Sequence, residues 1–259
     1  ENYKNNIHTI FMGSGSNVLA HDRGFDGIII TLKNTFKNLI IHDNNILAES
    51  GVMLGTMVKK ALKYNFSGLE SLIGVPGTIG GAIKMNAGAY GSEISNLLHS
   101  IIIIDQRGNE KTYLKDDILF DYRKSNIKNN HIIVSAFFEC EIGNKKNILK
   151  KRSDYSNKRK RTQPLKFRSA GSVFKNPSSS IAAGYLIDQA GLKGLEIGNA
   201  KISEKHANFI VNLGNASSYD ILKIIKIIKY EIYKKFKIKL ELEIKLIGFN
   251  KKELNEIQN

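Results

Sequence analysis

A hydroxyl, a cation and an amide occur close together in the second half of the chain. Ser172, Lys175 and Asn176 lie within five residues, directly before Pro177. Such a concentration of polar groups is typical of a ligand-binding turn. It is equally typical of a strand end that leads into a helix, so the residue types alone leave both interpretations open.

Two charged residues elsewhere are further candidates for chemistry. Arg123 directly follows Tyr122, and an arginine after an aromatic residue is usually a solvated charge. Glu243 alternates with Glu241 and Lys245, which places the three side chains on one face of an extended strand. Taken by itself, that face is also typical of a solvated surface.

Two glycine-rich stretches predict a close approach of the backbone to another group. Gly13-Ser14-Gly15-Ser16-Asn17 follows a predicted strand, and its consecutive amides could point at one anion, such as a pyrophosphate. An ordinary turn is the alternative, because the G-x-G-x-x-G spacing of a Rossmann fold is absent. The second stretch contains the loops Gly74–Ala82 and Met85–Gly91, which predict either a flat ligand against bare backbone or a tight crossing of packed elements.

Histidine and cysteine indicate neither a metal site nor an internal disulfide. The six histidines are scattered without metal-ligand spacing, so we expect no metal. Cys140 is the only cysteine and lies in an apolar run, which predicts a small buried residue.

The charge of the chain raises the question of an anionic partner. The 259 residues carry a formal net charge of +15, mostly from lysines spread along the whole length. The densest basic segment, Lys145–Arg161, has Tyr155 as its only aromatic residue and therefore lacks a platform for stacking bases. We expect no specific nucleic-acid partner. The apolar runs are also too short to span a bilayer, and no signal peptide is visible, so we expect no membrane partner.

Hydrophobic periodicity predicts the elements that must position these residues. Helices are expected over Leu54–Asn65 and Tyr219–Phe236, where apolar residues follow one helical face. Further helices are expected over Ser180–Ala190, which Gly191 ends, and over the polar, Lys- and Arg-rich segment Asn144–Thr162. Strands are expected over Ile7–Phe11, Gly27–Leu32, Leu39–His42, Ile46–Ala48, Leu97–Asp105, Glu110–Tyr113, Ile132–Ile142, Asn208–Leu213 and Leu240–Phe249. Strands and helices do not alternate regularly, which predicts an α+β fold. We place the boundary between two domains at 143/144, giving domains 1–143 and 144–259.

Five blocks occur in an order that resembles the UDP-N-acetylenolpyruvoylglucosamine reductases of peptidoglycan synthesis. They are Gly13–Asn17 with Gly24–Gly27, Gly74–Gly91, Asp121–Ser125, Ala170–Pro177 and Glu241–Gly248. The resemblance covers nearly the whole chain and is specific because the blocks occur together. The interval from Arg123 to Ser172 is short, as in the subclass without an inserted tyrosine loop.

The resemblance implies a fold and a set of ligands. The fold is a two-lobed FAD-binding domain of the vanillyl-alcohol-oxidase or PCMH type, followed by a substrate-binding α+β domain. FAD is expected to be held noncovalently, with NADPH as reductant. The expected flavin contacts are Gly13, Ser14, Gly15, Ser16, Asn17, Gly74, Pro76, Gly77, Thr78, Gly80, Gly81, Ala87 and Gly88. The expected substrate contacts are Tyr122, Lys175, Asn176 and Lys245, the last standing where many relatives have Arg.

The implied reaction reduces an enolpyruvyl UDP-sugar to UDP-N-acetylmuramate, with Arg123, Ser172 and Glu243 as catalytic residues. Arg123 would hold the substrate carboxylate, because a guanidinium fork matches it. Ser172 would protonate the carbanion that hydride delivery creates, and Glu243 would orient groups around the carboxylate. A cytoplasmic bacterial monomer is expected. The first strand of the family and a Gly-Gly turn are not found before Glu1, so the FAD-binding domain is expected to be N-terminally incomplete.

Three rival functions remain open at this point. The same flavin-binding architecture serves oxidases of alcohols and sugars, although the block Ala170–Pro177 argues against them. A basic nucleic-acid-binding protein is a second alternative, and an inactive truncated remnant is a third.

Overall fold

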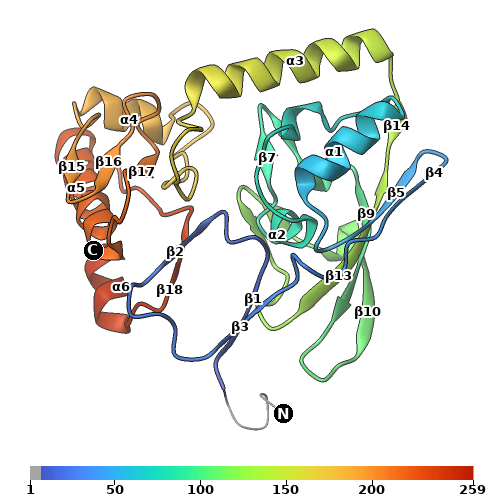
Figure 1. Cartoon of the computed structure of the whole chain (residues 1–259), viewed down its shortest axis with the longest axis horizontal. Helices are drawn as coiled ribbons and strands as arrows, with labels where there is room; N and C mark the ends of the chain where they lie inside the picture. Colours follow the sequence, from blue (N-terminus) through green and yellow to red (C-terminus); the bar gives the residue numbers. More distant parts are fainter. Residues whose placement is uncertain (1–6, 259) are drawn as a thin grey trace. The chain divides into compact units, whose positions relative to one another are not determined.

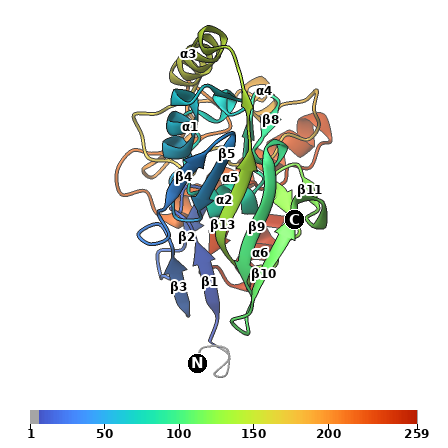
Figure 2. The ribbon, with the colours of Figure 1, turned by 90° about the vertical axis from the view of Figure 1, so that its right-hand side faces the viewer.

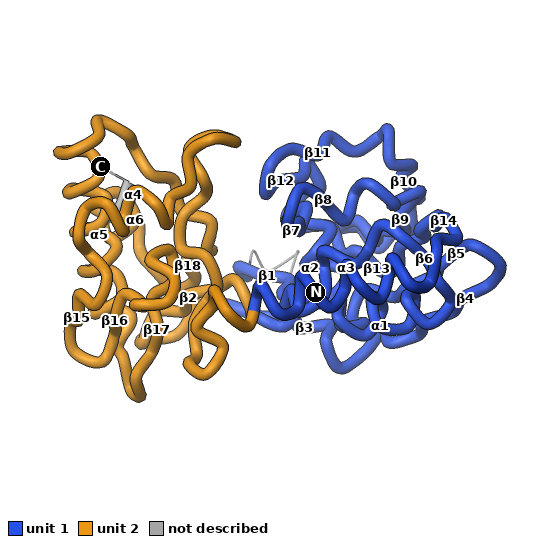
Figure 3. The backbone as a smooth tube through the Cα atoms, turned by 90° about the horizontal axis from the view of Figure 1, so that it is seen from above, with its two compact units in different colours: residues 1–15, 27–159 blue, residues 16–26, 160–259 orange. Residues whose placement is uncertain are grey.

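The computed structural model describes residues 7–258, which form two compact units. The first unit takes the chain up to Gly15 together with Gly27–Arg159, and the second takes Ser16–Asp26 together with the chain from Lys160 onward (Figure 3). The segment Ser16–Asp26 is therefore an early part of the sequence that packs with the late part.

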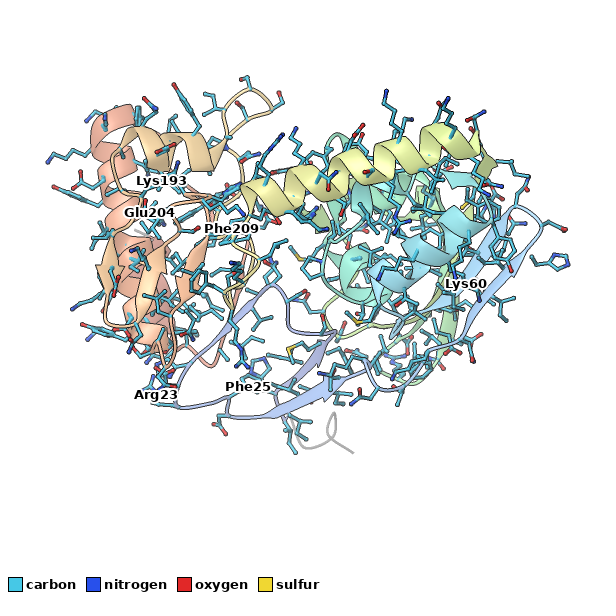
Figure 4. All side chains as sticks on the ribbon, turned by 45° about the horizontal axis from the view of Figure 1, so that its top comes forward. Arg23, Phe25, Lys60, Lys193, Glu204 and Phe209 are labelled. Carbon is cyan, nitrogen blue, oxygen red and sulfur yellow. The ribbon has the colours of Figure 1, made fainter. Side chains whose placement is uncertain are left out.

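A five-stranded antiparallel sheet is the centre of the first unit, with the strand order β10-β9-β13-β5-β4 (Figure 2). Its strands are β4 (Leu39–His42), β5 (Asn45–Glu49), β9 (Leu98–Ile104), β10 (Glu110–Leu114) and β13 (Ile132–Glu139). Helices α1 (Leu54–Lys63) and α2 (Ile79–Lys84) share one hydrophobic core with the sheet. The side chain of Lys60 on α1 also donates a 2.7 Å hydrogen bond to the carbonyl oxygen of Leu39 on β4 (Figure 4).

Short strand pairs and turns complete the first unit. The parallel pair is β1 (Thr9–Met12) with β3 (Ile28–Thr31). The antiparallel pairs are β6 (Phe66–Ser67) with β14 (Glu141–Ile142), β7 (Gly88–Ala89) with β8 (Ser92–Glu93), and β11 (Phe120–Asp121) with β12 (Lys124–Ser125). Single 3-10 turns cover Glu70–Leu72, Ile94–Asn96 and Lys115–Asp117. Helix α3 (Lys145–Thr162) follows, and the boundary between the units falls in its last turn.

The second unit places helices against a three-stranded antiparallel sheet (Figure 1). The sheet consists of β15 (Glu196–Ile197), β16 (Ala200–Ile202) and β17 (Ile210–Asn212), and the helices are α4 (Ala183–Gln189), α5 (Ser218–Phe236) and α6 (Lys251–Gln258). The parallel pair β2 (Val18–Ala20) with β18 (Lys245–Ile247) joins the early segment to the end of the chain. Helix α5 begins at a capping box in which Ser217 and Asp220 bond each other's backbone amides.

The α+β class predicted from the sequence is confirmed, and most predicted elements occur at the predicted places. The predicted strand Leu240–Phe249 is shorter, because only Lys245–Ile247 forms a regular ladder. The sequence predicted neither β2 nor α6. The compact units divide between Arg159 and Lys160 rather than at 143/144, because α3 packs with the first unit through Ile148. Residues 1–6 of the predicted first domain lie outside the described residues.

Candidate functional site

The segments that carry Ser172 and Glu243 lie side by side within the second unit. The amide nitrogen of Glu243 donates a 2.8 Å hydrogen bond to the carbonyl oxygen of Val173, the residue after Ser172. The amide of Lys175 donates in turn to the carbonyl oxygen of Glu241, at 2.9 Å. Two blocks that are far apart in the sequence are thereby fixed in one antiparallel register.

Asn17 attaches the early segment of the chain to the same place. Its side-chain amide donates a 3.0 Å hydrogen bond to the carbonyl oxygen of Glu243, and its own carbonyl oxygen accepts one of 2.9 Å from the amide of Lys245. Asn17 and Ser16 thus belong to the second unit, whereas Gly13, Ser14 and Gly15 belong to the first. The predicted nest is divided between the units, and the described hydrogen bonds of Asn17 go to the Glu243 segment.

The other edge of the Ser172 segment is bound by Asn208, a residue that the sequence analysis missed. The side chain of Asn208 accepts a hydrogen bond from the amide of Phe174 and donates one to its carbonyl oxygen, at 2.9 and 2.8 Å. No sequence motif identifies Asn208, because its role depends on a partner distant in the chain. A polar residue next to the apolar run of β17 was the one available signal.

Positive charge is concentrated around Glu243. The ammonium group of Lys175 lies 3.2 Å from a carboxylate oxygen of Glu241. The pKa of Lys245 is lowered, first by partial desolvation and then by repulsion from Lys175, while Glu243 opposes the shift. The arrangement favours an anionic ligand, which would relieve the repulsion between the two lysines. Asn176, also predicted to bind ligand, uses its side-chain oxygen to accept a 3.1 Å hydrogen bond from the amide of Ala183 at the start of α4.

Arg123 lies in the first unit, in the two-residue turn between β11 and β12. Its φ angle is 56°, in the left-handed region that costs a residue with a side chain about 1 kcal/mol or more. Its guanidinium group lies over the ring of Tyr122, 4.8 Å from the ring centre, and donates a 2.8 Å hydrogen bond to the carbonyl oxygen of Gly88. These contacts orient the cation, and they bring together three predicted site residues.

The turn that carries Arg123 is tied to β7 and β8 by a buried amide. Asn86 is fully buried, and its side chain donates hydrogen bonds to Glu93 at 2.6 Å and to the carbonyl oxygen of Asp121 at 3.2 Å. Asn86 also has a φ angle of 42°, so the backbone turns sharply directly before Ala87 and Gly88. This region of the second predicted loop therefore supports Arg123.

The glycine-rich loops of the first unit cross at a distance that excludes side chains. A Cβ atom on Gly13 would collide with the hydroxyl oxygen of Thr78, and one on Gly80 would lie 2.9 Å from the Cβ of Ser50. Thr78 is itself held, because its hydroxyl accepts a hydrogen bond from the amide of Gly81 at the start of α2. Gly74, Pro76 and Gly77 lead into this crossing, and Gly77 accepts a 2.9 Å hydrogen bond from the amide of Leu54.

Buried hydroxyl groups beside these loops have no partner within the part of the chain that the structure describes. They are the side chains of Ser14, Ser50 and Ser71. An unpaired buried hydroxyl costs on the order of 1 to 3 kcal/mol, so the three groups are suited to a ligand that supplies acceptors or donors. In residues 7–258 no helix is long and apolar enough to cross a membrane.

Family models match both parts of the chain. A model described as FAD binding domain matches residues 1–112, and a model described as UDP-N-acetylenolpyruvoylglucosamine reductase, C-terminal domain, matches residues 163–247. The first unit fits FAD through the buried hydroxyls of Ser14 and Ser50, which have no partner among the described residues and can bond a ligand. The tight crossings of Gly13 with Thr78 and of Gly80 with Ser50 hold the loops in place. FAD is the cofactor that this domain type and family carry.

Similar proteins extend over most of the chain. The UDP-N-acetylenolpyruvoylglucosamine reductase of Carboxydothermus hydrogenoformans is 45% identical over 95% of this chain and 81% of its own length. The corresponding reductase of Clostridium tetani is 42% identical over 95% of this chain and 80% of its own. The crystal structure of the enzyme from Thermus caldophilus superimposes with a TM-score of 0.81 at 34% identity, over 93% of this chain and 86% of that one. The chain therefore belongs to the UDP-N-acetylenolpyruvoylglucosamine reductase family.

Proposed function

We propose that this protein reduces UDP-N-acetyl-3-O-(1-carboxyvinyl)-glucosamine to UDP-N-acetylmuramate with NADPH as reductant, as a step of peptidoglycan synthesis. The observation that carries the proposal is the register that fixes Glu243 beside Val173, and hence beside Ser172. A hydroxyl, a carboxylate and two lysines then lie on two neighbouring segments of one unit, which is the set of groups that an anionic, proton-accepting substrate requires.

The glycine-rich loops hold FAD in this proposal. The groups assigned to it are the backbone and side chains of Gly13, Ser14, Gly15, Ser16, Gly74, Pro76, Gly77, Thr78, Gly80, Gly81, Ala87 and Gly88. FAD supplies the two-electron chemistry that passes a hydride from NADPH to the enolpyruvyl group. The protein contributes loops that are held by the tight crossings of Gly13 with Thr78 and of Gly80 with Ser50. It also contributes hydrogen bonds from the hydroxyls of Ser14 and Ser50, which otherwise have no described partner.

Arg123 and the lysines bind the substrate. The guanidinium group, already oriented by Tyr122 and Gly88, presents its fork to the carboxylate of the enolpyruvyl group. Lys175, Asn176 and Lys245 attract the remainder of the anionic sugar nucleotide. Desolvation and repulsion from Lys175 lower the pKa of Lys245, and an anion bound next to it would favour its protonated form.

Ser172 delivers the proton that completes the reduction. Hydride addition to the terminal carbon leaves negative charge on the adjacent carbon, and that carbon is basic enough to take a proton from a hydroxyl. The charge spreads into the carboxylate, where Arg123 stabilises it and Glu243 orients the neighbouring groups. Flavin binding is assigned to residues 1–143, which also supply Arg123 and Tyr122, and the remaining substrate contacts are assigned to residues 144–259. The segment Ser16–Asp26 packs with the second unit.

Anaerobic half-reactions test the proposal. When NADPH is added to purified protein loaded with FAD, the flavin absorbance at about 450 nm is expected to disappear, because FAD accepts the hydride. Addition of the enolpyruvyl substrate should restore the absorbance and yield UDP-N-acetylmuramate. Reoxidation no faster than in buffer alone would refute the function. Flavin reduction by an alcohol or sugar instead would favour the oxidase alternative.

Two further properties belong to the proposal. NADPH and UDP-sugars are charged metabolites that are used where they are made, so we place the protein in the bacterial cytoplasm. We also propose that it acts as a monomer. Light scattering of the FAD-loaded protein measures the second property directly, and a stable dimer would contradict it.

A further inference from the structure

The side chain of Asn208 forms hydrogen bonds with both the backbone amide and the backbone carbonyl of Phe174, two residues after Ser172. Its side-chain oxygen accepts from the amide of Phe174 at 2.9 Å, and its side-chain nitrogen donates to the carbonyl oxygen of Phe174 at 2.8 Å. Its own backbone carbonyl oxygen accepts a 2.9 Å hydrogen bond from the amide of Val173. The carboxamide thus replaces the peptide group that a neighbouring strand would present.

The backbone of Ser172 is anchored mainly through the residue that follows it, Val173. Val173 is bound on both edges, by Asn208 and by Glu243, and is 3% exposed. On the preceding side, Gly171 has a φ angle of 81° and no atom within 4 Å of the place that a Cβ would take. The peptide before Ser172 therefore has freedom that the peptide after it lacks.

The surroundings of Asn208 allow one orientation of the carboxamide. Asn208 is 4% exposed, so water cannot substitute for either hydrogen bond without an opening of the core. The backbone amide nitrogen of Asn208 donates to Nδ1 of His206 at 3.3 Å. A neutral His206 is required for that bond, and desolvation lowers the pKa of His206 accordingly.

We propose that Asn208 is a positioning residue for proton donation by Ser172, acting through the paired hydrogen bonds to Phe174. The inference rests on the proposed function. Asn208 does not contact the reacting atoms; it fixes the peptide after Ser172 so that the hydroxyl points at a single place. In the proposed reaction, hydride transfer from NADPH to FAD needs no proton from Ser172, so the two half-reactions should separate the role of Asn208 from general stability.

The test is stopped-flow kinetics of each half-reaction in the FAD-loaded protein. Asn208→Ala should reduce with NADPH at the parent rate and reoxidise with the enolpyruvyl substrate about 10- to 100-fold more slowly, as expected for a misplaced catalytic group. Asn212→Ala is the matched control, because Asn212 is a nearby asparagine at the end of β17 whose side chain bonds the loop amides of Gly214 and Ala216. It should reoxidise like the parent.

A second variant keeps the test decisive if Asn208→Ala is poorly folded. Asn208→Asp has the same shape, and its ionised carboxylate still accepts from the amide of Phe174 but repels the carbonyl oxygen. The protonated acid donates to that oxygen again, so reoxidation relative to the parent at each pH should recover as the pH is lowered. Amide hydrogen exchange at Phe174 should be fast in Asn208→Ala and slow in Asn208→Asp.

The outcomes separate the inference from the proposed function. Failure of the parent to reoxidise with substrate would refute the function, and the inference with it. A normal parent together with unchanged reoxidation in Asn208→Ala would overturn the inference alone. Equal losses in both half-reactions, or an equal loss in Asn212→Ala, would assign Asn208 a merely structural role and would also overturn it.

Discussion

The amide nitrogen of Glu243 donates a 2.8 Å hydrogen bond to the carbonyl oxygen of Val173. This bond fixes the register between the segment that carries Ser172 and the segment that carries Glu243, which meet at the bridge between Phe174 and Leu242. The backbone of Glu243 is thereby held opposite Val173, one residue from Ser172. A shift by one residue would place Leu242 or Ile244 opposite Val173 instead, so the pairing determines that the carboxylate residue takes this position.

Removal of the Asn17 side chain should impair catalysis without loss of flavin. Asn17→Ala deletes the 3.0 Å hydrogen bond to the carbonyl oxygen of Glu243, a partly buried contact. We expect reoxidation by substrate to slow by about tenfold, the equivalent of about 1.4 kcal/mol. The dissociation constant of FAD should stay the same. A large rise in that constant, with normal reoxidation, would return Asn17 to the set of flavin contacts.

A methyl group at Gly13 should weaken flavin binding. In Gly13→Ala the new Cβ collides with the hydroxyl of Thr78, which cannot move freely because it caps α2. Overpacking of this kind costs about 1 to 3 kcal/mol, so the FAD dissociation constant should rise by about tenfold or more. Gly55→Ala is the control, since a Cβ there meets nothing within 4 Å. Fluorescence titration of both variants measures the difference, and equal affinities would show that the crossing does not shape the flavin site.

The substrate affinity should depend on pH through Lys245. Its pKa is lowered by desolvation and by Lys175, so it loses its proton at a lower pH than an ordinary lysine. Deprotonation removes an attraction for the anionic substrate, and KM should therefore rise as the pH climbs from about 7 to about 10. Arginine stays protonated in this range, so Lys245→Arg should flatten the profile.

The exposed Lys251, at the start of α6, provides the comparison for that profile. Lys251→Arg should leave the pH dependence of KM as it is in the parent. A parent KM that is constant across the range would contradict the assignment of Lys245 to the substrate. A steep profile that persists in Lys245→Arg would assign the dependence to another group.

Local sequence patterns predicted most of the long helices and strands, but they could not predict contacts between segments that are distant in the sequence. The apolar spacing from Leu54 to Leu62 predicted α1 because one helical face is buried, and those residues are buried. The pairing of Asn208 with Phe174 could not be predicted, since either residue alone is unremarkable in type and the bond joins distant segments. For the same reason, the sequence could not predict that Asn17 belongs to the second unit.

The residues proposed for the site come from the family resemblance, which does not identify the groups that support them. The family resemblance singled out Ser172, Arg123 and Glu243, and the structure places each on an element with defined partners. The strand predicted around Glu243 is interrupted before Lys245, because Leu242 and Glu243 pair with the Ser172 segment while Lys245 pairs with β2. Alternation of side chains along one continuous strand was therefore too simple a description of this region.

Proton donation by Ser172 is the central claim, and stopped-flow reoxidation of Ser172→Ala tests it most directly. Reduction of FAD by NADPH needs no proton from Ser172, so this variant should reduce at the parent rate. Reoxidation by the enolpyruvyl substrate should fall by about 100-fold or more, as is typical when one positioned acid is lost. Ser172→Cys, which restores an acidic proton, should recover part of the rate. Reoxidation of Ser172→Ala as fast as the parent would contradict the account and leave Ser172 as an ordinary residue at a strand end.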